Sequence, residues 1–359
     1  MQSLPENIST AMLMELIKQG ITLYSHPLKV FGLDGTKEYA KQVAGHLNIE
    51  LTPHVEKSFE DGECYAKSSD GDEGNVRGHD VFVIQSLYGD ETESVSDKFM
   101  KLAIFVGSLR GASANTITVV IPHLGWARQD RKTESRAPVT TKVVASMLES
   151  VGIDHAVFMD VHNLSAEQNA FSLRCPTDNL ESKKLHAEWC AKTLPKNAKI
   201  TVLTPDSGGF ARAVRFRNAL QKLLNTSVQV AFLDKLRVDG SVEYADTIVG
   251  GSVEGTEVLI YDDMISTGGT MTKAYHAVNK FGGHVHAICA THGLFVGKAN
   301  QYLDEIGAST RIVIADTVEP WRLSPSNRGK VDIVSTSKMT ADAIWRIHSG
   351  TGSISALLR

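Results

Sequence analysis

Short apolar runs that alternate with longer stretches of helical period constrain the fold of this chain more than any other feature. The run Val81–Ile84 precedes a helical stretch at Asp97–Arg110, and Ile117–Ile121 precedes another at Thr140–Val151. These runs are apolar throughout rather than at every second residue, which is typical of strands in parallel sheets that are covered on both faces. The pattern therefore predicts an α/β fold with helices on both sides of each sheet.

The same rhythm recurs through the second half of the chain. A length of 359 residues suffices for about two domains, and we expect a boundary near residues 170–185, where PTDNLES is typical of a turn. The further strand candidates are His155–Asp160, Ile200–Leu203, Val228–Leu233, Val258–Tyr261, Val285–Ala290 and Ile312–Ala315, and the further helices are Phe210–Leu224 and Met271–Phe281.

Composition excludes several classes of protein. Lys and Arg number 37 against 41 Asp and Glu, and the formal charge of −4 argues against general binding to nucleic acid or anionic membranes. It does not exclude a small anionic ligand held by local cations. The four cysteines form no C-x-x-C pair, MQSLPENIST lacks the pattern of a signal peptide, and no run approaches the roughly 18 apolar residues of a membrane span. We expect a reduced, soluble, cytoplasmic protein.

Polar residues suited to chemistry follow the strand candidates. In α/β sheets ligands bind at the carboxyl ends of the strands, so these segments are where a site is expected. In chain order the segments read RQDRK, DVH, PDSGG, DKLR, DDMISTGGT and THG.

The segment VLIYDDMISTGGT, residues 258–270, carries the most information. It predicts a strand, then paired carboxylates, then a Ser/Thr/Gly loop at a helix N-terminus. Exposed backbone N–H groups and the positive end of the helix dipole suit such a loop to a monophosphate. The aspartates repel phosphate but suit vicinal sugar hydroxyls or a hydrated divalent cation.

A ligand with a phosphate at one end and a diol at the other is a ribose 5-phosphate. The loop is not a Walker A motif, because it lacks the Gly-Lys-Ser/Thr sequence. The alternative is an ordinary N-capped helix that follows an acidic turn.

Beyond this loop, the sequence resembles ribose-phosphate diphosphokinases, also called phosphoribosyl pyrophosphate synthetases. The resemblance extends from about residue 55 to the C-terminal SISALLR, with the motifs in family order. The motifs are FEDGE, NVRGHD, ARQDRKTESRAP, DVH, PDSGGFARA, DKLR, the DDMISTGGT loop and ATHGLFVG.

The resemblance implies two similar phosphoribosyltransferase-type domains, each a mostly parallel sheet flanked by helices. We assign residues 1–178 to the first, completed by the C-terminal segment 338–359, and residues 179–337 to the second. The implied reaction transfers the diphosphoryl group of ATP to the 1-hydroxyl of ribose 5-phosphate. Its products are AMP and 5-phosphoribosyl 1-diphosphate (PRPP), a precursor in nucleotide biosynthesis.

The resemblance also implies roles for the loop residues. Lys235 and Arg237 of DKLR would stabilise the transition state, although Leu236 stands where the family usually has a second Arg. His162 would contact ATP phosphate and its metal, and Asp206 would be a carboxylate linked to Mg²⁺ near the ribose. Ribose 5-phosphate would be bound by Asp262, Asp263, Ser266, Thr267, Gly268, Gly269 and Thr270.

For ATP, the resemblance implies two sets of contacts. Arg128 and Gln129 would touch the nucleotide, and the polar stretch after them would close over it as a lid. Phe59, Asp61 and Glu63 of FEDGE would reach the ATP site of a neighbouring subunit, so we expect a homo-oligomer with shared sites. Taken alone, each of these stretches is equally typical of a solvated turn or loop.

Some segments depart from the family pattern. About 25 residues precede the family start, the stretches DGDEG (70–74) and YGDETESVS (88–96) are longer and more acidic than usual, and NLSAEQNAF replaces a paired aromatic ending after His162. An alternative function is a catalytically silent regulatory subunit of the family, but that subunit would lose some of the catalytic residues, and none is lost here. A phosphoribosyltransferase would have the DD…TGGT loop without DKLR, DVH and FEDGE.

Overall fold

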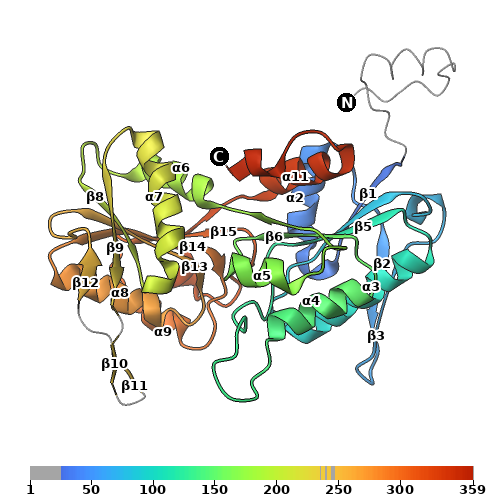
Figure 1. Cartoon of the computed structure of the whole chain (residues 1–359), viewed down its shortest axis with the longest axis horizontal. Helices are drawn as coiled ribbons and strands as arrows, with labels where there is room; N and C mark the ends of the chain where they lie inside the picture. Colours follow the sequence, from blue (N-terminus) through green and yellow to red (C-terminus); the bar gives the residue numbers. More distant parts are fainter. Residues whose placement is uncertain (1–25, 235, 239–240, 244–246, 359) are drawn as a thin grey trace, which may run out of the picture.

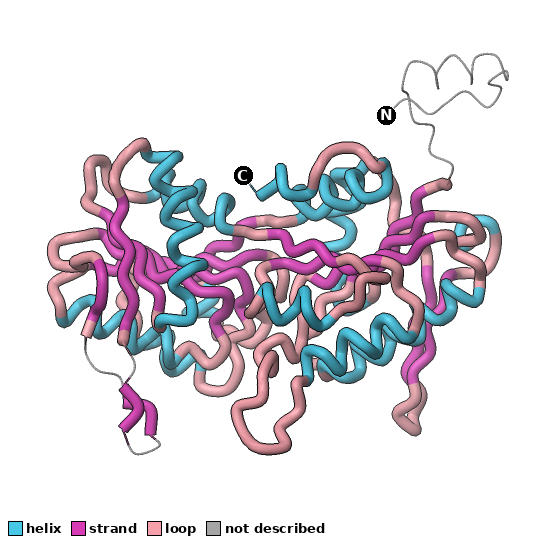
Figure 2. Tube along the Cα trace, viewed as in Figure 1, coloured by secondary structure: helices cyan, strands magenta, loops and turns pink. Residues whose placement is uncertain are grey.

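The structure of the chain is a computed structural model. It describes residues 26–234, 236–238, 241–243 and 247–358, with only the backbone for 236–238 and 241–243. Figure 1 shows two α/β units side by side, and Figure 2 shows that a sheet runs through the middle of each. The predicted class of two mostly parallel sheets flanked by helices is therefore confirmed.

The first unit is built on a five-stranded sheet in the order β1-β4-β5-β6-β7, and all neighbouring strands are parallel. Its strands are β1 (Leu28–Gly32), β4 (Asp80–Ile84), β5 (Thr116–Ile121), β6 (His155–Met159) and β7 (Thr177–Leu180). Its helices are α2 (Lys37–Leu47), α3 (Val95–Gly111), α4 (Thr140–Ser150) and α5 (Leu164–Ala170).

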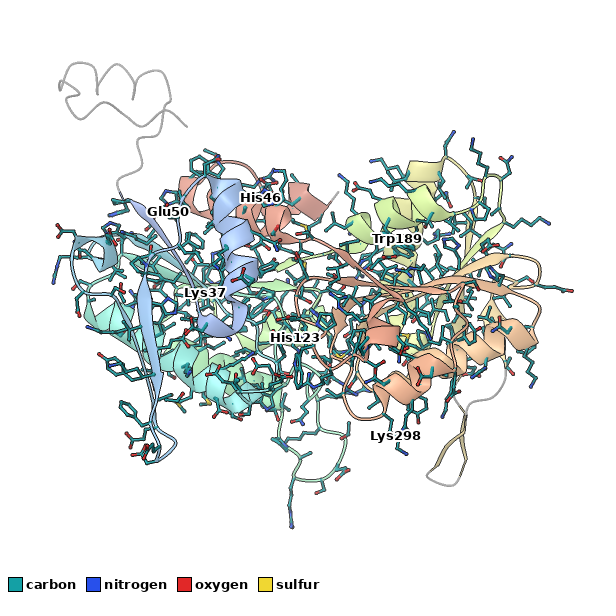
Figure 3. All side chains as sticks on the ribbon, turned by 180° about the vertical axis from the view of Figure 1, so that it is seen from behind. Lys37, His46, Glu50, His123, Trp189 and Lys298 are labelled. Atoms are coloured by element: carbon teal, nitrogen blue, oxygen red, sulfur yellow. The ribbon has the colours of Figure 1, made fainter. Side chains whose placement is uncertain are left out.

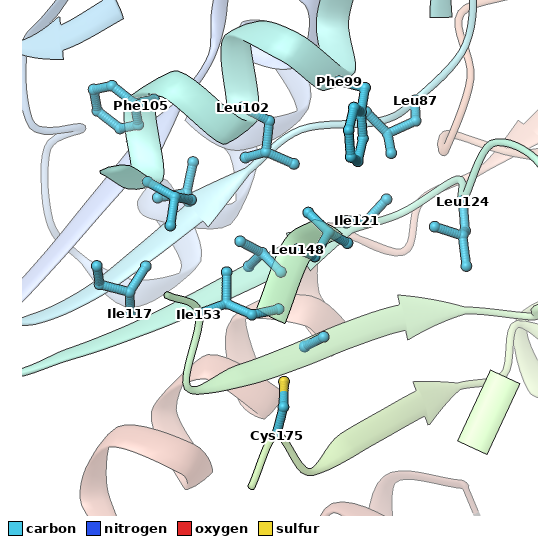
Figure 4. Close-up of a cluster of buried hydrophobic side chains, with 14 of the residues drawn as sticks. Leu87, Phe99, Leu102, Phe105, Ile117, Ile121, Leu124, Leu148, Ile153 and Cys175 are labelled. Atoms are coloured by element: carbon cyan, nitrogen blue, oxygen red, sulfur yellow. The ribbon is translucent and has the colours of Figure 1, made fainter. Parts of the chain in front are cut away.

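The alternating side chains of one strand explain why these runs are apolar throughout. On β4, Val81 and Val83 join the core under α3 and α4, of which Figure 4 gives a close-up. Phe82 and Ile84 point the other way and pack with α2 and with the C-terminal helix α11 (Ser337–Ser349). Because both faces are covered, the four buried positions Val81–Ile84 are all apolar.

The second unit is a seven-stranded sheet in the order β12-β9-β8-β13-β14-β15-β16, parallel except where β12 joins β9. Its strands are β8 (Ile200–Thr204), β9 (Val228–Leu233), β12 (Ile248–Gly250), β13 (Glu257–Ile265), β14 (His284–Gly293), β15 (Arg311–Ala315) and β16 (Val331–Val334). Its helices are α6 (Lys183–Thr193), α7 (Phe210–Leu224), α8 (Gly269–Lys280), α9 (Ala299–Asp304) and α10 (Pro325–Arg328).

The C-terminal helix returns to the first unit. Figure 1 shows α11 beside α2, and the hydroxyl of Tyr39 on α2 lies 2.9 Å from Thr336 Oγ1 and 2.6 Å from Thr340 Oγ1. Ala343 and Ile344 are fully buried against the first sheet. The domain limits of 1–178 with 338–359, and 179–337, stay a prediction.

Two hairpins lie outside the sheets. They are β2 (His54–Ser58) with β3 (Cys64–Ser68), and β10 (Leu236–Val238) with β11 (Ser241–Glu243). Figures 1 and 2 show that both project from the same side of the molecule as the loop between β5 and α4. Short 3₁₀ turns complete the chain at Asp34–Thr36, Asp72–Gly74, Ser207–Gly209 and Ile354–Leu358.

Strand β13 is longer than the predicted strand Val258–Tyr261. It continues through both aspartates to Ile265, because β14 keeps pairing with it: Asp262 lies opposite Ala290 and Ile265 opposite Gly293. The carboxylates are therefore held on the end of a strand rather than in a loop. None of the helices that the structure describes is long and apolar enough to span a bilayer.

Candidate active site

A cleft of about 270 Å³ opens at the carboxyl end of β13. Several predicted site residues meet there although they are far apart in the sequence. The lining residues are Arg128, His162, Asp206, Asp262, Asp263, Met264, Ile265, Ser266, Thr267, Gly268, Thr270 and Met271. Gly269 does not line the cleft itself but is the first residue of α8.

The loop before α8 has the backbone of an anion site. Gly268 has a φ of +86°, a conformation that favours glycine, and a Cβ built on Gly269 would lie 3.3 Å from the ring of Tyr302. Both glycines therefore let the chain turn tightly into the 12-residue helix α8. The unpaired N–H groups of its first turn and the hydroxyls of Ser266, Thr267 and Thr270 can donate to a phosphate in this cleft.

Arg212 pairs with both aspartates of the cleft. From the first turn of α7, its Nη1 lies 2.8 Å from Asp262 Oδ1 and 3.2 Å from Asp263 Oδ1. The backbone N–H of Asp263 also donates to Asp262 Oδ1, at 2.9 Å. Arg212 lies within the PDSGGFARA motif, but the sequence alone predicts no role for it. The missed signal is a cation one helical turn after PDSGG.

His162 reaches this cluster from the first unit. It follows β6, and its Nδ1 lies 2.8 Å from Asp263 Oδ2, while Arg212 Nη2 donates to its backbone carbonyl at 3.0 Å. The turn that carries it begins at Asp160, a buried residue with a φ of +41°. The Asp160 carboxylate accepts hydrogen bonds from Ser182 and from Thr291 on β14, so the second unit holds this turn in position.

Burial and charge shift the pKa values of these acids in opposite directions. Burial and the neighbouring Asp263 raise the pKa of Asp262. Burial alone would also raise the pKa of Asp263, but the hydrogen bond from His162 and the charge of Arg212 lower it below its usual range. The same hydrogen bond raises the pKa of His162. Asp263 is therefore the carboxylate that stays ionised.

Asp206 and Arg128 also line the cleft. The Asp206 carboxylate accepts from the backbone N–H of Gly209 at 3.2 Å and so caps the turn before α7. Arg128 also lines a larger cavity of about 690 Å³, together with Gln129. Tyr88, His123 and Trp126 form part of its wall, and Figure 3 shows His123 near the middle of the molecule. This volume suffices for a nucleotide-sized ligand.

Other predicted site residues lie elsewhere. Phe59, Asp61 and Glu63 form the tip of the β2–β3 hairpin and line neither of these two cavities, and Phe59 is half exposed. Lys235 lies outside the described residues. Arg237 has a described backbone in β10, paired with Val242, but its side chain lies outside the description.

Within the described parts of the chain, one group of side chains is close enough to hold a metal ion, and it lies outside the cleft. Ligand atoms of Asp34, His54 and Glu56 lie within 4.8 Å of one another. Glu56 Oε1 already accepts the backbone N–H of Asp34 at 2.7 Å and lies 2.8 Å from His54 Nε2. These contacts explain the cluster without an ion.

A parallel sheet that carries an acid pair and then a glycine-bearing phosphate loop defines a protein of the phosphoribosyltransferase type. Comparisons with known proteins narrow this class. Residues 28–152 match the N-terminal domain of ribose phosphate pyrophosphokinase, and residues 177–318 match the phosphoribosyl transferase domain. The chain belongs to the ribose-phosphate pyrophosphokinase family, whose members are diphosphotransferases of nucleotide biosynthesis.

Individual relatives cover most of the chain. It is 38% identical to the ribose-phosphate pyrophosphokinase of Pasteurella multocida over 92% of this chain and 98% of that protein. It is 39% identical to that of Shewanella oneidensis, with the same two coverages. A crystal structure of phosphoribosylpyrophosphate synthetase from Mycobacterium smegmatis aligns with a TM-score of 0.76 at 27% identity, over 90% of this chain and 100% of that one.

Proposed function

We propose that this chain is a ribose-phosphate diphosphokinase. It transfers the diphosphoryl group of ATP to the 1-hydroxyl of ribose 5-phosphate and releases 5-phosphoribosyl 1-diphosphate and AMP. The observation that carries the proposal is one cleft that combines the Asp262–Asp263 pair, the Ser266–Thr270 loop and His162, beside a cavity of about 690 Å³. The 38% identity to a ribose-phosphate pyrophosphokinase over 92% of the chain supports it.

Ribose 5-phosphate binds along the carboxyl end of β13. Its phosphate lies on the loop formed by Ser266, Thr267, Gly268, Gly269 and Thr270, and its hydroxyls face the aspartate pair. Because the two ends of the cleft attract groups of opposite character, the sugar can bind in only one direction. That direction brings the 1-hydroxyl toward the side of the cleft that His162 and Arg128 line.

ATP binds beside the sugar. Arg128 lines both cavities, so its guanidinium can neutralise phosphate oxygens between the two substrates, and Gln129 lines the larger one. Phe59, Asp61 and Glu63 act on the ATP site of a neighbouring subunit, and their exposure on a projecting hairpin is compatible with that role. Lys235 and Arg237 supply the cations that stabilise charge on the transferred group.

Mg²⁺ suits the same cleft. Asp206 and His162 line it together, and one carboxylate and one imidazole leave the remaining ligand positions of a hard cation to ATP oxygens and water. When bound, the ion would neutralise the phosphoryl oxygens of ATP. We place the protein in the cytoplasm and expect it to act as a homo-oligomer. In each chain, residues 1–178 and 338–359 form one domain and residues 179–337 the other.

AMP release tests the proposal. Purified protein is incubated with ATP, Mg²⁺ and ribose 5-phosphate, and AMP is followed by chromatography beside a Lys235→Ala control. We expect AMP only when ribose 5-phosphate is present, and a strong loss in the control. If neither protein forms AMP at millimolar substrates, the chain is the silent regulatory subunit instead.

A further inference from the structure

The two aspartates of the cleft have different surroundings, which suggests that they have different tasks. We infer that Asp263, together with Arg212, is a positioning residue that fixes His162, and that Asp262 is the carboxylate that meets the sugar hydroxyls. This inference rests on the proposed function and divides the roles within its site.

The Asp263 carboxylate is poorly accessible to a ligand. It is 2% exposed, against 19% for Asp262. Each of its oxygens already has a partner, since Oδ2 lies 2.8 Å from His162 Nδ1 and Oδ1 lies 3.2 Å from Arg212 Nη1. Because the Asp263 carboxylate is almost completely buried, a sugar hydroxyl could reach its oxygens only if these partners moved away, and that would leave buried charge unpaired, which is costly. Asp262 is the more accessible acceptor.

The contact to Asp263 determines which nitrogen of His162 faces the cleft. An ionised carboxylate only accepts hydrogen bonds, so Nδ1 of His162 carries the proton that it donates. In the neutral imidazole this leaves Nε2 as the acceptor. The ring is 39% exposed and lines the cleft. In this form Nε2 is therefore the atom that can bind a metal ion or accept the proton of the 1-hydroxyl.

The second unit fixes His162 at its backbone as well. Arg212 Nη2 donates to the His162 carbonyl at 3.0 Å, while Nη1 of the same guanidinium binds both aspartates. Two residues before the histidine, the carboxylate of Asp160 accepts hydrogen bonds from the Ser182 N–H at 2.8 Å and from Thr291 Oγ1 at 2.7 Å. His162 comes from the first sheet, but residues of the second sheet and its helices determine its orientation and position.

Two substitutions of identical chemistry separate the roles. Asp263→Asn and Asp262→Asn make the same isosteric exchange of a carboxyl group for an amide, so each is the control for the other. For Asp263→Asn we expect kcat to fall about 10–100-fold, as for other residues that orient a functional histidine, with little change in KM for ribose 5-phosphate. For Asp262→Asn we expect that KM to rise about tenfold or more, because an amide nitrogen replaces one carboxyl oxygen and cannot accept a hydrogen bond from a sugar hydroxyl. A similar rise of this KM in both variants, with kcat of Asp263→Asn unchanged, would overturn the inference.

A second measurement needs no turnover. The full-length protein is labelled with ¹⁵N-histidine, the His162 signal is assigned by its absence in His162→Gln, and the tautomer is determined by NMR without substrates. We expect the Nδ1–H form in the wild type and its loss in Asp263→Leu, with folding checked by circular dichroism. An unchanged tautomer in folded Asp263→Leu contradicts the inference. If the wild type forms no AMP, the proposed function fails, but the NMR measurement of the His162 tautomer still tests the positioning role of Asp263.

Discussion

At the scale of residues, the candidate site depends on a few groups held away from their ordinary states. Hydrogen bonding to Asp263 raises the pKa of His162, and His162 and Arg212 lower that of Asp263. Gly268 takes a backbone conformation that other residues rarely adopt. Each of these features links the chemistry of the site to the stability of the fold, and each can be tested by one substitution.

The His162–Asp263 contact makes stability depend on pH. Because the folded-state pKa of His162 lies above its unfolded value, its contribution is complete below that unfolded value, about 6.5, and is lost as pH rises through the folded pKa. Asp263 stays ionised over this range. We expect His162→Gln to lower the free energy of unfolding more at about pH 5.5 than at about pH 9. Urea titrations measure the difference, and a change that is equal at both pH values contradicts it. His46→Gln, at an exposed position of α2, serves as the control.

Replacement by alanine should affect stability in opposite directions at Gly268 in the phosphate loop and at Gly45 in α2. Gly268→Ala must adopt a φ of +86°, so we expect a loss of about 1–2 kcal/mol in the free energy of unfolding and a higher KM for ribose 5-phosphate. Gly45→Ala lies within α2, where an added Cβ meets nothing within 4 Å. It should stabilise the protein by about 0.5–1 kcal/mol. Equal stabilisation by both changes would show that the loop does not require glycine.

At the scale of elements, the sequence predicted what apolar patterning determines. The continuous runs of β4, β5, β13 and β14 were found because both faces of each strand are buried. By contrast, β7 (Thr177–Leu180, sequence TDNL) was missed, because backbone pairing with β6 rather than side-chain burial makes it a strand. The acid pair and its loop were found because they are contiguous. Arg212 received no role because its contact with Asp262 joins residues 50 apart, and no local pattern carries such a contact.

The start of α3 gives a prediction about one element. Ser94 and Asp97 form a capping box, in which each side chain accepts a hydrogen bond from the other's backbone N–H. The cap lies within the acidic stretch 88–96, and α3 begins directly after Ser94. We expect Ser94→Ala to cost about 1 kcal/mol of unfolding free energy in urea titrations. The exposed Ser96→Ala should change it by less than about 0.5 kcal/mol; a similar cost for both would rule out the cap.

At the scale of the whole molecule, the site lies where the carboxyl ends of the two sheets meet. Hydrogen bonds cross this junction: Ser86 Oγ donates to the Thr317 carbonyl at 2.6 Å, and His292 Nε2 lies 3.1 Å from the Met159 carbonyl. The chain then returns through α11 to the first sheet. A reaction between two substrates can use this arrangement because each unit contributes residues to one cleft.

Removal of the C-terminal helix should destabilise one unit more than the other. A chain that ends at Thr336 loses Ile344 and its neighbours from the core over α2, and one such buried side chain alone contributes about 2–5 kcal/mol. We expect faster amide hydrogen exchange in β1 and β4, with exchange in β13 and β14 nearly unchanged. Lys338→Ala, on the exposed face of α11, is the control. Equal acceleration in both sheets would contradict the assignment of residues 338–359 to the first domain.

Transfer of the β-phosphorus of ATP tests the central claim most directly. The protein is incubated with Mg²⁺, ribose 5-phosphate and ATP that carries a radioactive β-phosphorus, and the products are separated by chromatography. We predict that the label moves to the sugar product and that unlabelled AMP appears in equal amount. Label that stays in ADP, or that is released as free diphosphate without a labelled sugar, would contradict the proposed diphosphokinase.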